Sequence, residues 1–304
     1  MAISRSQLVK ELEPGLNALF GLEYKRYENQ HAEIYTSESS DRAFEEEVML
    51  SGFANAQIKG EGQGVAFDEA QETYTARYTN ETIALAFAIT EEAIEDNLYD
   101  RLASRYTKAL ARSMSNAKEV KGAQPLNNGL PGVATFNSGD GVSLFNTAHT
   151  TISGTNVSNT LTTQADLNET SLEAALIDIA AFTDERGLRI AEKGVKMIIP
   201  SANQFNAERL MKSQGRPGTA DNDINAINSM GMIPQGYRVN NFLTDADSWY
   251  IITDVPNGMK MFQRTPLTTS MEGDFDTGNV RYKARERYVF GVSDYRGIFG
   301  CEGA

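Results

Sequence analysis

The sequence predicts an α+β protein in which extended parts of the chain accompany one long helix and one separate α/β unit. Residues 52–90 alternate between two faces on both sides of a glycine-rich stretch, and residues 90–122 then switch to a helical period. Residues 259–300 return to alternation after a region, 168–253, in which helix and strand patterns follow one another. This order of patterns predicts two domains joined by long elements.

Length and composition indicate a chain that folds and stays outside membranes. The 304 residues, 40% of them hydrophobic, suffice for about two domains with a substantial core. The longest apolar runs, such as IALAFAI at 83–89, are far too short to span a bilayer. The first residues carry charges where a signal peptide needs an apolar core. We therefore expect a cytoplasmic product without a membrane partner.

The sequence supplies little for catalysis or metal binding. A single cysteine, Cys301, excludes an intrachain disulfide and any multi-cysteine zinc site. With two histidines, His31 and His149, metal and histidine-based acid–base chemistry are poorly supported, and His149 is as easily a structural, hydrogen-bonding residue. No nucleophile elbow or His-Glu-x-x-His motif occurs. We expect no catalytic residue, no cofactor and no metal.

One glycine-rich stretch, GEGQG at 60–64, invites comparison with phosphate-binding loops. Both nucleotide-binding motifs need a helix directly after the loop, so that its N-terminal amides meet the phosphates. Here another strand-like limb follows. The pattern favours the flexible tip of a β-hairpin.

The charge of the chain is negative and unevenly distributed. Acids exceed bases by 13, so the molecule as a whole repels phosphate backbones and is expected to contact DNA only weakly, without sequence specificity. Between residues 38 and 100 there are 15 acids and three bases, whereas the bases collect later.

The first part of the chain predicts an arm followed by an extended loop. Residues 1–50 carry a short helical pattern and a second possible short helix at 41–49. Residues 51–89 are expected to form a long β-hairpin, which in isolation is marginally stable in water and so must lie on something else. The candidate contact residues of this loop are Lys59, Glu61, Phe67, Tyr74, Arg77 and Tyr78.

A long spine helix is predicted for residues 90–122, with Thr90 as its N-cap. About 32 residues rising about 1.5 Å each give a rod of roughly 48 Å, against a mean helix of about 11 or 12 residues. Its apolar positions should face a core. The candidate core residues of the spine are Ile94, Leu98, Leu102 and Leu110.

The α/β unit occupies residues 123–258 and begins with a loop-rich passage up to about residue 160. Helices are expected at 168–182 and from residue 201, and strands at 194–200, 237–242 and 249–253. This alternation predicts a compact domain with one sheet.

Residues 259–304 are expected to form a closing hairpin whose second strand is apolar on one face and basic on the other. The apolar face should pack on the spine helix. The basic face suits packaged nucleic acid, the acidic stretch of another copy, or plain solvent. We favour the copy, because the acidic surplus must be neutralised when copies pack closely. The basic residues are Arg281, Lys283, Arg285 and Arg287.

This order of elements resembles the major capsid protein of tailed double-stranded-DNA bacteriophages, which has the Hong Kong 97-type fold. The text KMFQRTPLTTSMEGDFDTGNVRYKARERYVFGVSDYRGIFG is similar to the closing strands of that family, which end in an Asp-Tyr-Arg-like turn. GVKMIIPSANQFNAERLM is similar to the strand–Pro–helix step of its axial domain, and GLPGVATF with LFNTAHTT is reminiscent of the Mu-like head subunit branch. No single motif is diagnostic, but the order is.

The resemblance implies an architecture. Residues 1–50 would be the N-terminal arm, 51–89 the extended loop, and 90–122 the spine of a peripheral domain. Residues 123–258 would form the axial domain and 259–304 the closing hairpin of the peripheral domain. In such proteins the extended loop lies across a neighbouring subunit.

The resemblance also implies a function and partners. Pentamers and hexamers of the chain would build an icosahedral shell around double-stranded DNA, in a virion assembled in the bacterial cytoplasm. A separate scaffolding protein, a portal and a decoration protein are the implied partners. Some members also join the loop covalently to the peripheral domain, for which Lys59 and Asn279 are the matching residues, although no supporting acid can be assigned.

Two alternatives stay open at this point. An encapsulin shares the fold and encloses an enzyme cargo. An α/β enzyme could use the loop-rich passage at 125–160 as its site, although no nucleophile–base set supports it.

Overall fold

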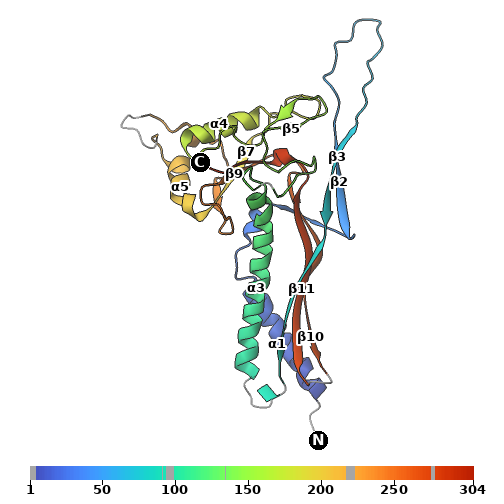
Figure 1. Ribbon diagram of the computed structural model, residues 1–304, viewed down its shortest axis with the longest axis vertical. Helices are drawn as coiled ribbons and strands as arrows, with labels where there is room; N and C mark the ends of the chain where they lie inside the picture. The colour runs from blue at the N-terminus through green and yellow to red at the C-terminus, as the bar shows by residue number, and fades with distance from the viewer. Residues whose placement is uncertain (1–4, 91, 94–98, 134, 217–222, 275–277) are drawn as a thin grey trace.

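Two four-stranded sheets organise the chain into a long rod and a smaller head (Figure 1). The structure is a computed structural model that describes residues 5–90, 92–93, 99–133, 135–216, 223–274 and 278–304, with the backbone alone for 5–13 and 99–102. The rod holds the chain's N-terminal helix and its longest helix, and a loop extends beyond the head at the far end (Figure 1).

The rod is built on a sheet of order β1-β10-β11-β4. β10 (Met259–Gly273) and β11 (Val280–Val292) form the long antiparallel hairpin predicted from the sequence. β4 (Glu81–Ile89) runs antiparallel to β11, and β1 (Thr36–Ser39) runs parallel to β10. β11 is therefore an inner strand, paired on both sides along most of its length.

One long helix, α3 (Tyr99–Asn128), covers one face of this sheet, and α1 (Arg5–Tyr24) packs against α3 and β10. Between them lies a core that includes Leu110, which is 4% exposed. Ile94 and Leu98 lie outside the described residues, and Leu102 lies in α3 at a position whose side chain is not described. The other buried members of this core are Leu16, Phe20, Ile89, Ala103, Ala111, Met114, Tyr282 and Ala284.

The helix continues beyond the end predicted at residue 122, through Gly122 and Pro125. Gly122 allows a close approach, because a Cβ there would lie 2.9 Å from the Cβ of His31. Pro125 removes one backbone hydrogen bond, but Leu126, in the next position, is completely buried in the main core. Tertiary packing thus extends a helix that its own sequence would end.

The alternation predicted for β11 is confirmed, with one polar residue on the inner face. Glu286 is completely buried and accepts hydrogen bonds from Lys118 Nζ and from Tyr24 Oη, each at 3.0 Å. These two hydrogen bonds join the sheet to α3 and to α1. Because the Lys118 side chain is also buried, loss of either partner would leave an uncompensated charge under the helix.

The extended loop differs from its prediction in where its strands lie. β2 (Phe44–Leu50) pairs antiparallel with β3 (Glu72–Thr79), while residues 51–71 form no regular strand. The short helix expected at 41–49 is wrong, because pairing with β3 overrides the local pattern.

The returning limb, read as one strand in the sequence, is divided at Asn80. β3 pairs with β2 on one side of this residue, and β4 pairs with β11 on the other. The Asn80 side chain donates hydrogen bonds to Ser40 Oγ at 2.8 Å and to the Arg42 carbonyl at 3.1 Å. Ser40 and Asn80 are both buried, so the point of division is fixed.

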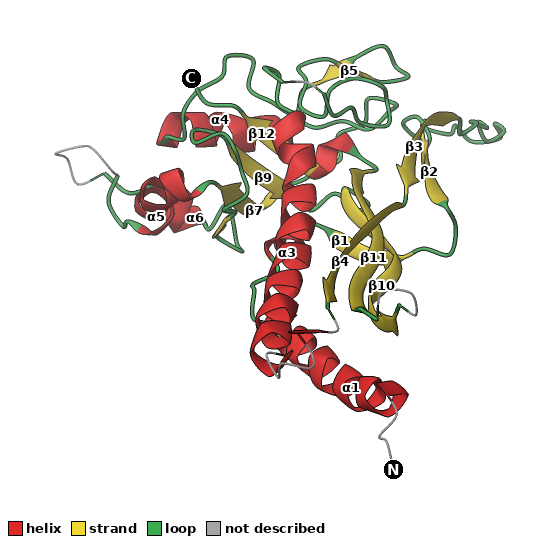
Figure 2. Cartoon of the chain, turned by 60° about the horizontal axis from the view of Figure 1, so that its bottom comes forward, coloured by secondary structure: helices red, strands yellow, loops and turns green. Residues whose placement is uncertain are grey.

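The head contains the second sheet, of order β12-β9-β7-β8, with helices packed beside it (Figure 2). The helix and strands predicted at 168–182, 194–200 and 249–253 are confirmed. The last strand pairs with β9, so the end of the chain leaves the hairpin and joins the head. The elements of the head are β5 (His149–Thr150), β6 (Asn156–Val157), α4 (Glu169–Ala180), β7 (Gly194–Ile199), α5 (Gln204–Lys212), α6 (Ala226–Met230), β8 (Tyr237–Val239), β9 (Trp249–Thr253) and β12 (Ile298–Cys301), and the short 3-10 helices of the chain are η1 (Gln30–Glu33), η2 (Ser201–Asn203) and η3 (Tyr295–Gly297).

Replacing Glu286 by Ala should lower the free energy of unfolding by about 3 to 5 kcal/mol, because Lys118 is left buried without its counter-charge. Glu272→Ala, at an exposed position of the same hairpin, is the matched control and should change it by less than about 0.5 kcal/mol. Urea unfolding followed by circular dichroism measures both. Similar, small losses in the two variants would contradict a stabilising role for the pair.

Candidate intersubunit surfaces

The corner between rod and head is made by the Asp-Tyr-Arg turn. The Asp294 carboxylate accepts a hydrogen bond from the backbone N–H of Arg296 at 2.9 Å and so caps η3. The guanidinium of Arg296 contacts that carboxylate, pairs with Glu185 and donates to the carbonyl of Thr183 at 2.9 Å. The burial of all three charged side chains fixes the direction in which the chain enters the head.

The base of the extended loop is anchored to this corner by a buried chain of hydrogen bonds. Tyr78 Oη, on β3, bonds to Ser293 Oγ, which in turn donates to Glu47 on β2. Lys260 Nζ, on β10, pairs with Glu47 and, at 3.0 Å, with Glu38. Burial opposes the charge of Lys260, but the hydrogen bonds with the two carboxylates outweigh it and raise the pKa of Lys260.

Tyr78 was expected to contact a neighbouring subunit, but this anchor places it inside its own chain. Tyr78 is 2% exposed and packs on Phe262 at 4.8 Å between ring centroids, so its own chain buries it. Its ring requires Gly291, where a Cβ would lie 2.4 Å from it. Tyr74, half-buried, reaches the Ser293 carbonyl at 3.4 Å. Both tyrosines hold the loop from within, and the alternation that marked them could not show which face the chain itself would cover.

The outer part of the loop has few contacts with its own chain. Arg186 ties residues 68 and 69 to the head, by a pair with Asp68 at 3.7 Å and a hydrogen bond to the Glu69 carbonyl. Beyond this tie, Ile58 is 101% exposed and Phe67 98% exposed. Lys59 and Glu61 are exposed in the same tip. Apolar side chains in that state are typical of a surface that another molecule covers.

Arg77 contacts its own chain at the loop base and is also exposed to solvent. Its guanidinium lies 4.0 Å from the ring centroid of Phe44 and 3.8 Å from a Glu46 carboxylate oxygen, both on β2. The side chain is exposed, so it stays accessible from outside while it bridges the two strands.

The basic face of β11 is flanked by small residues. Arg281, Lys283 and Arg285 are exposed, and Arg287 is half-buried. Their partners in register on β4 are Ala88, Ala86, Ala84 and Thr82. Arg281 pairs with Asp274 at the hairpin turn, whereas Lys283 and Arg285 have no ion pair with any residue that the structure describes. The face is a shallow, positively charged strip beside an unpaired strand edge, that of β4.

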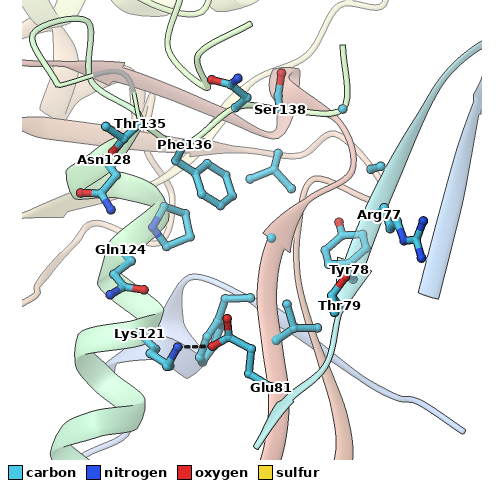
Figure 3. A pocket seen from close by; sticks show the side chains of 18 of the residues that line it. Arg77, Tyr78, Thr79, Glu81, Lys121, Gln124, Asn128, Thr135, Phe136 and Ser138 are labelled. Carbon is cyan, nitrogen blue, oxygen red and sulfur yellow. Dashed lines mark hydrogen bonds and ion pairs between the residues drawn. The ribbon is translucent and has the colours of Figure 1, made fainter. Parts of the chain in front are cut away.

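A cleft of about 490 Å³ separates the loop base from the end of α3 (Figure 3). Its lining is mainly polar, and an ion pair between Lys121 and Glu81 crosses it. Gln124 and Asn128 of α3 line one side of the cleft, and Asn128 lies beside the 135–139 segment, because its carbonyl accepts hydrogen bonds from the Thr135 and Phe136 amides (Figure 3). These side chains offer hydrogen bonds and charge.

His149, in the loop-rich passage, is structural. It is completely buried, with Nδ1 2.6 Å from Asp140 and Nε2 3.2 Å from Asn159 Oδ1, and it stacks on Tyr295. Burial opposes ionisation of Asp140, but hydrogen bonds from His149 and Ser138 outweigh it and lower the pKa of Asp140. The ring is therefore closed to solvent. Other parts of the 125–160 passage, Val133 and Ile152 among them, are exposed.

The family of the chain follows from comparison with known proteins. A family model described as phage capsid protein matches residues 73–300, which contain the spine, the head and the closing hairpin. The chain belongs to this family. No curated protein matches the chain.

Solved structures share the fold of this capsid protein at low sequence identity. The capsid of Myoviridae phage XM1 is 12% identical over 89% of each chain, with a TM-score of 0.52. The procapsid of bacteriophage JBD30 is 14% identical over 99% of this chain and 77% of its own, also at 0.52. A virus-like particle from Pyrococcus furiosus is 9% identical over 94% and 98%, again at 0.52.

The α+β fold of the Hong Kong 97 type is therefore confirmed, and the protein is a phage capsid protein, a component of the virion. The virus-like particle shows that the fold alone does not separate phage heads from other shells, and the family match is what does so. Placement in the Mu-like branch stays a prediction.

Two further observations concern sites of other kinds. None of the described helices has the length and apolar character needed to cross a bilayer. Within the described ranges, no cluster of three or more His, Cys, Asp or Glu side chains is placed to hold a metal ion.

Tyr78→Phe should loosen the loop base without unfolding the rod. Loss of the hydroxyl removes the hydrogen bond to Ser293 Oγ and leaves that group with one buried partner fewer, at a cost of about 1 to 2 kcal/mol. Amide hydrogen exchange in β3 should become about 10-fold faster while α3 keeps its protection. Thr75→Ala, exposed on the same strand, should leave exchange unchanged. Uniform protection in all three proteins would exclude the anchor.

Proposed function

We propose that the chain is the major head subunit of a tailed bacteriophage, and that its copies form pentamers and hexamers closing an icosahedral shell around double-stranded DNA. Its role is structural and involves no catalysis. Heterologous contacts between identical subunits generate such rings when their rotation closes. A separate scaffolding protein, a portal and a decoration protein complete the proposed set of partners, and assembly takes place in the bacterial cytoplasm.

The exposed tip of the extended loop carries this proposal. Phe53, Ile58 and Phe67 lie at exposures of 60% or more on a segment without regular strands, and burial of such side chains on a neighbouring copy would remove apolar area from water. Tyr78 anchors the base of the loop to the corner, so the tip extends from a fixed point of attachment. A pre-positioned arm loses less entropy on binding than a free one.

We propose the basic strip of β11 as the surface that receives the loop of the next copy. The loop carries acids at Glu61, Glu69 and Glu72, and Lys283 and Arg285 of the strip have no ion pair among the described residues. Opposite charge gives orientation and faster association. The alanines of β4 leave room for a strand lying flat beside the cations.

The covalent joining that the resemblance suggested has no support within one chain. The loop that holds Lys59 and the turn that holds Asn279 lie at opposite ends of the molecule (Figure 1). Any bond between these residues would have to link different copies.

Replacing residues 53–69 by a short glycine turn should give a protein that folds but does not form shells. The deletion spares β3, whose Ala76 and Tyr78 are buried, so the melting temperature should stay within about 2 °C of that of the intact chain. Negative-stain microscopy of the concentrated protein should show closed shells or capsomer rings for the intact chain and small particles for the variant. Shells formed without the tip would overturn the proposed contact.

Reversing charge with Lys283→Glu and Arg285→Glu should reduce shell formation at low salt and less so at about 1 M salt, where the Debye length is about 3 Å. Adding Glu61→Lys to this variant should restore part of the loss by exchanging the signs across the contact. Light scattering during assembly measures the yield. An identical defect at every salt concentration would indicate that the two side chains act through packing.

A further inference from the structure

The face of α3 turned away from the sheet carries exposed cations that take no part in stabilising the fold. Between residues 103 and 128 the helix has five bases and one acid. Two of the bases, Lys118 and Lys121, pair with Glu286 and Glu81. The acid, Glu119, is buried against His31 and does not reach the surface.

The remaining three, Arg105, Lys108 and Arg112, are exposed and make no ion pair or hydrogen bond with any residue that the structure describes. We call them the spine triad. Spacings of three and four residues place them on one face of the helix. From the first to the last they span about 10 Å along the helix axis.

Among the described residues, the groove beside the triad has a single acid in its lining. Lys108 and Arg112 line a shallow groove of about 410 Å³ between α3 and the end of α1. The acid in this groove, Glu23, is largely buried and accepts hydrogen bonds from Arg26 and Tyr27. A positive strip therefore stands out on a chain whose net charge is −13.

The shape and lining of the groove favour a polyanion with a regular backbone over a protein partner. Apart from Tyr27 and Ala109, its lining is polar or charged, and it has no apolar pocket of the kind that anchors a protein interface. Phosphate contacts need cations alone. One strand of B-DNA presents a phosphate about every 3.4 Å of its axis, so about 10 Å covers about three of them.

We propose that the spine triad contacts the phosphate backbone of double-stranded DNA without sequence preference, and that this face of the rod is turned to the lumen of the shell. The inference rests on the proposed function for the presence of DNA in that lumen. It separates two basic surfaces: the β11 strip serves the neighbouring subunit and the spine triad serves the genome. With three contacts on an acidic molecule, binding is weak and reversible, as release of the genome requires.

The test compares the salt dependence of DNA binding. A labelled duplex of about 30 base pairs is titrated with the intact chain, followed by fluorescence anisotropy, between about 50 and about 200 mM salt. Each phosphate contact contributes about 0.9 to the slope of log affinity against log salt. Arg105→Gln, Lys108→Gln and Arg112→Gln together should reduce the slope by about 2 to 3 and lower affinity at least about 10-fold at low salt.

The matched control removes three exposed cations that lie outside both proposed surfaces, with Arg42→Gln, Lys193→Gln and Arg209→Gln. It should keep the slope of the intact chain. All six positions are exposed, so circular dichroism should show unchanged folding. An unchanged slope in the triad variant, an equal loss in the control, or no binding by the intact chain at low salt overturns the proposal.

Polyglutamate is the competing probe. If polyglutamate binds the intact chain more tightly than the duplex does, and the triad variant loses that binding, the triad face belongs to an acidic polypeptide. That result would overturn the DNA proposal. Negative-stain microscopy of the same samples keeps the two proposals distinguishable. Absence of shells counts against the proposed function, whereas the slope of duplex binding decides the role of the triad.

Discussion

The double pairing of β11, with β10 on one side and β4 on the other, is the interaction on which the rest of this capsid protein depends. Its inner face carries Glu286, which joins the sheet to α3 and α1, and its outer face carries the basic strip. The strand leads directly into the Asp-Tyr-Arg corner that fixes the head. Loss of this pairing would separate helix, head and loop at once, since each is attached through the same strand.

Much of this architecture could be predicted from the residues. The closing hairpin, the spine and the head elements at 168–182 and 194–200 followed from periodicity, because each repeats one pattern over many residues and is stabilised by its own chain. The loop was harder. Its limb looks continuous across Asn80, and local alternation cannot tell which of two partners a strand will join, since that choice is made by residues far away in sequence.

Some candidate contact residues of the loop are buried and others exposed, again because of residues far away in sequence. Tyr78 and Phe67 are both aromatic residues of the predicted extended loop, yet Tyr78 is buried beside Gly291 while Phe67 is almost fully exposed. The difference depends on a glycine more than 200 positions later, which admits one ring and has no counterpart at the tip. The spine triad was visible in sequence only as part of a general excess of cations. Separating it from Lys118 and Lys121 required the positions of Glu286 and Glu81.

The uninterrupted passage of the chain from β3 through Asn80 into β4 gives the rod a mechanical property (Figure 1). A tangential pull on the loop tip travels along covalent bonds into a strand that lies antiparallel beside β11. The ladder is then loaded in shear, so its hydrogen bonds share the tension and do not open one after another. The subunit is thus built to resist stretching of a shell along the direction in which its arms reach.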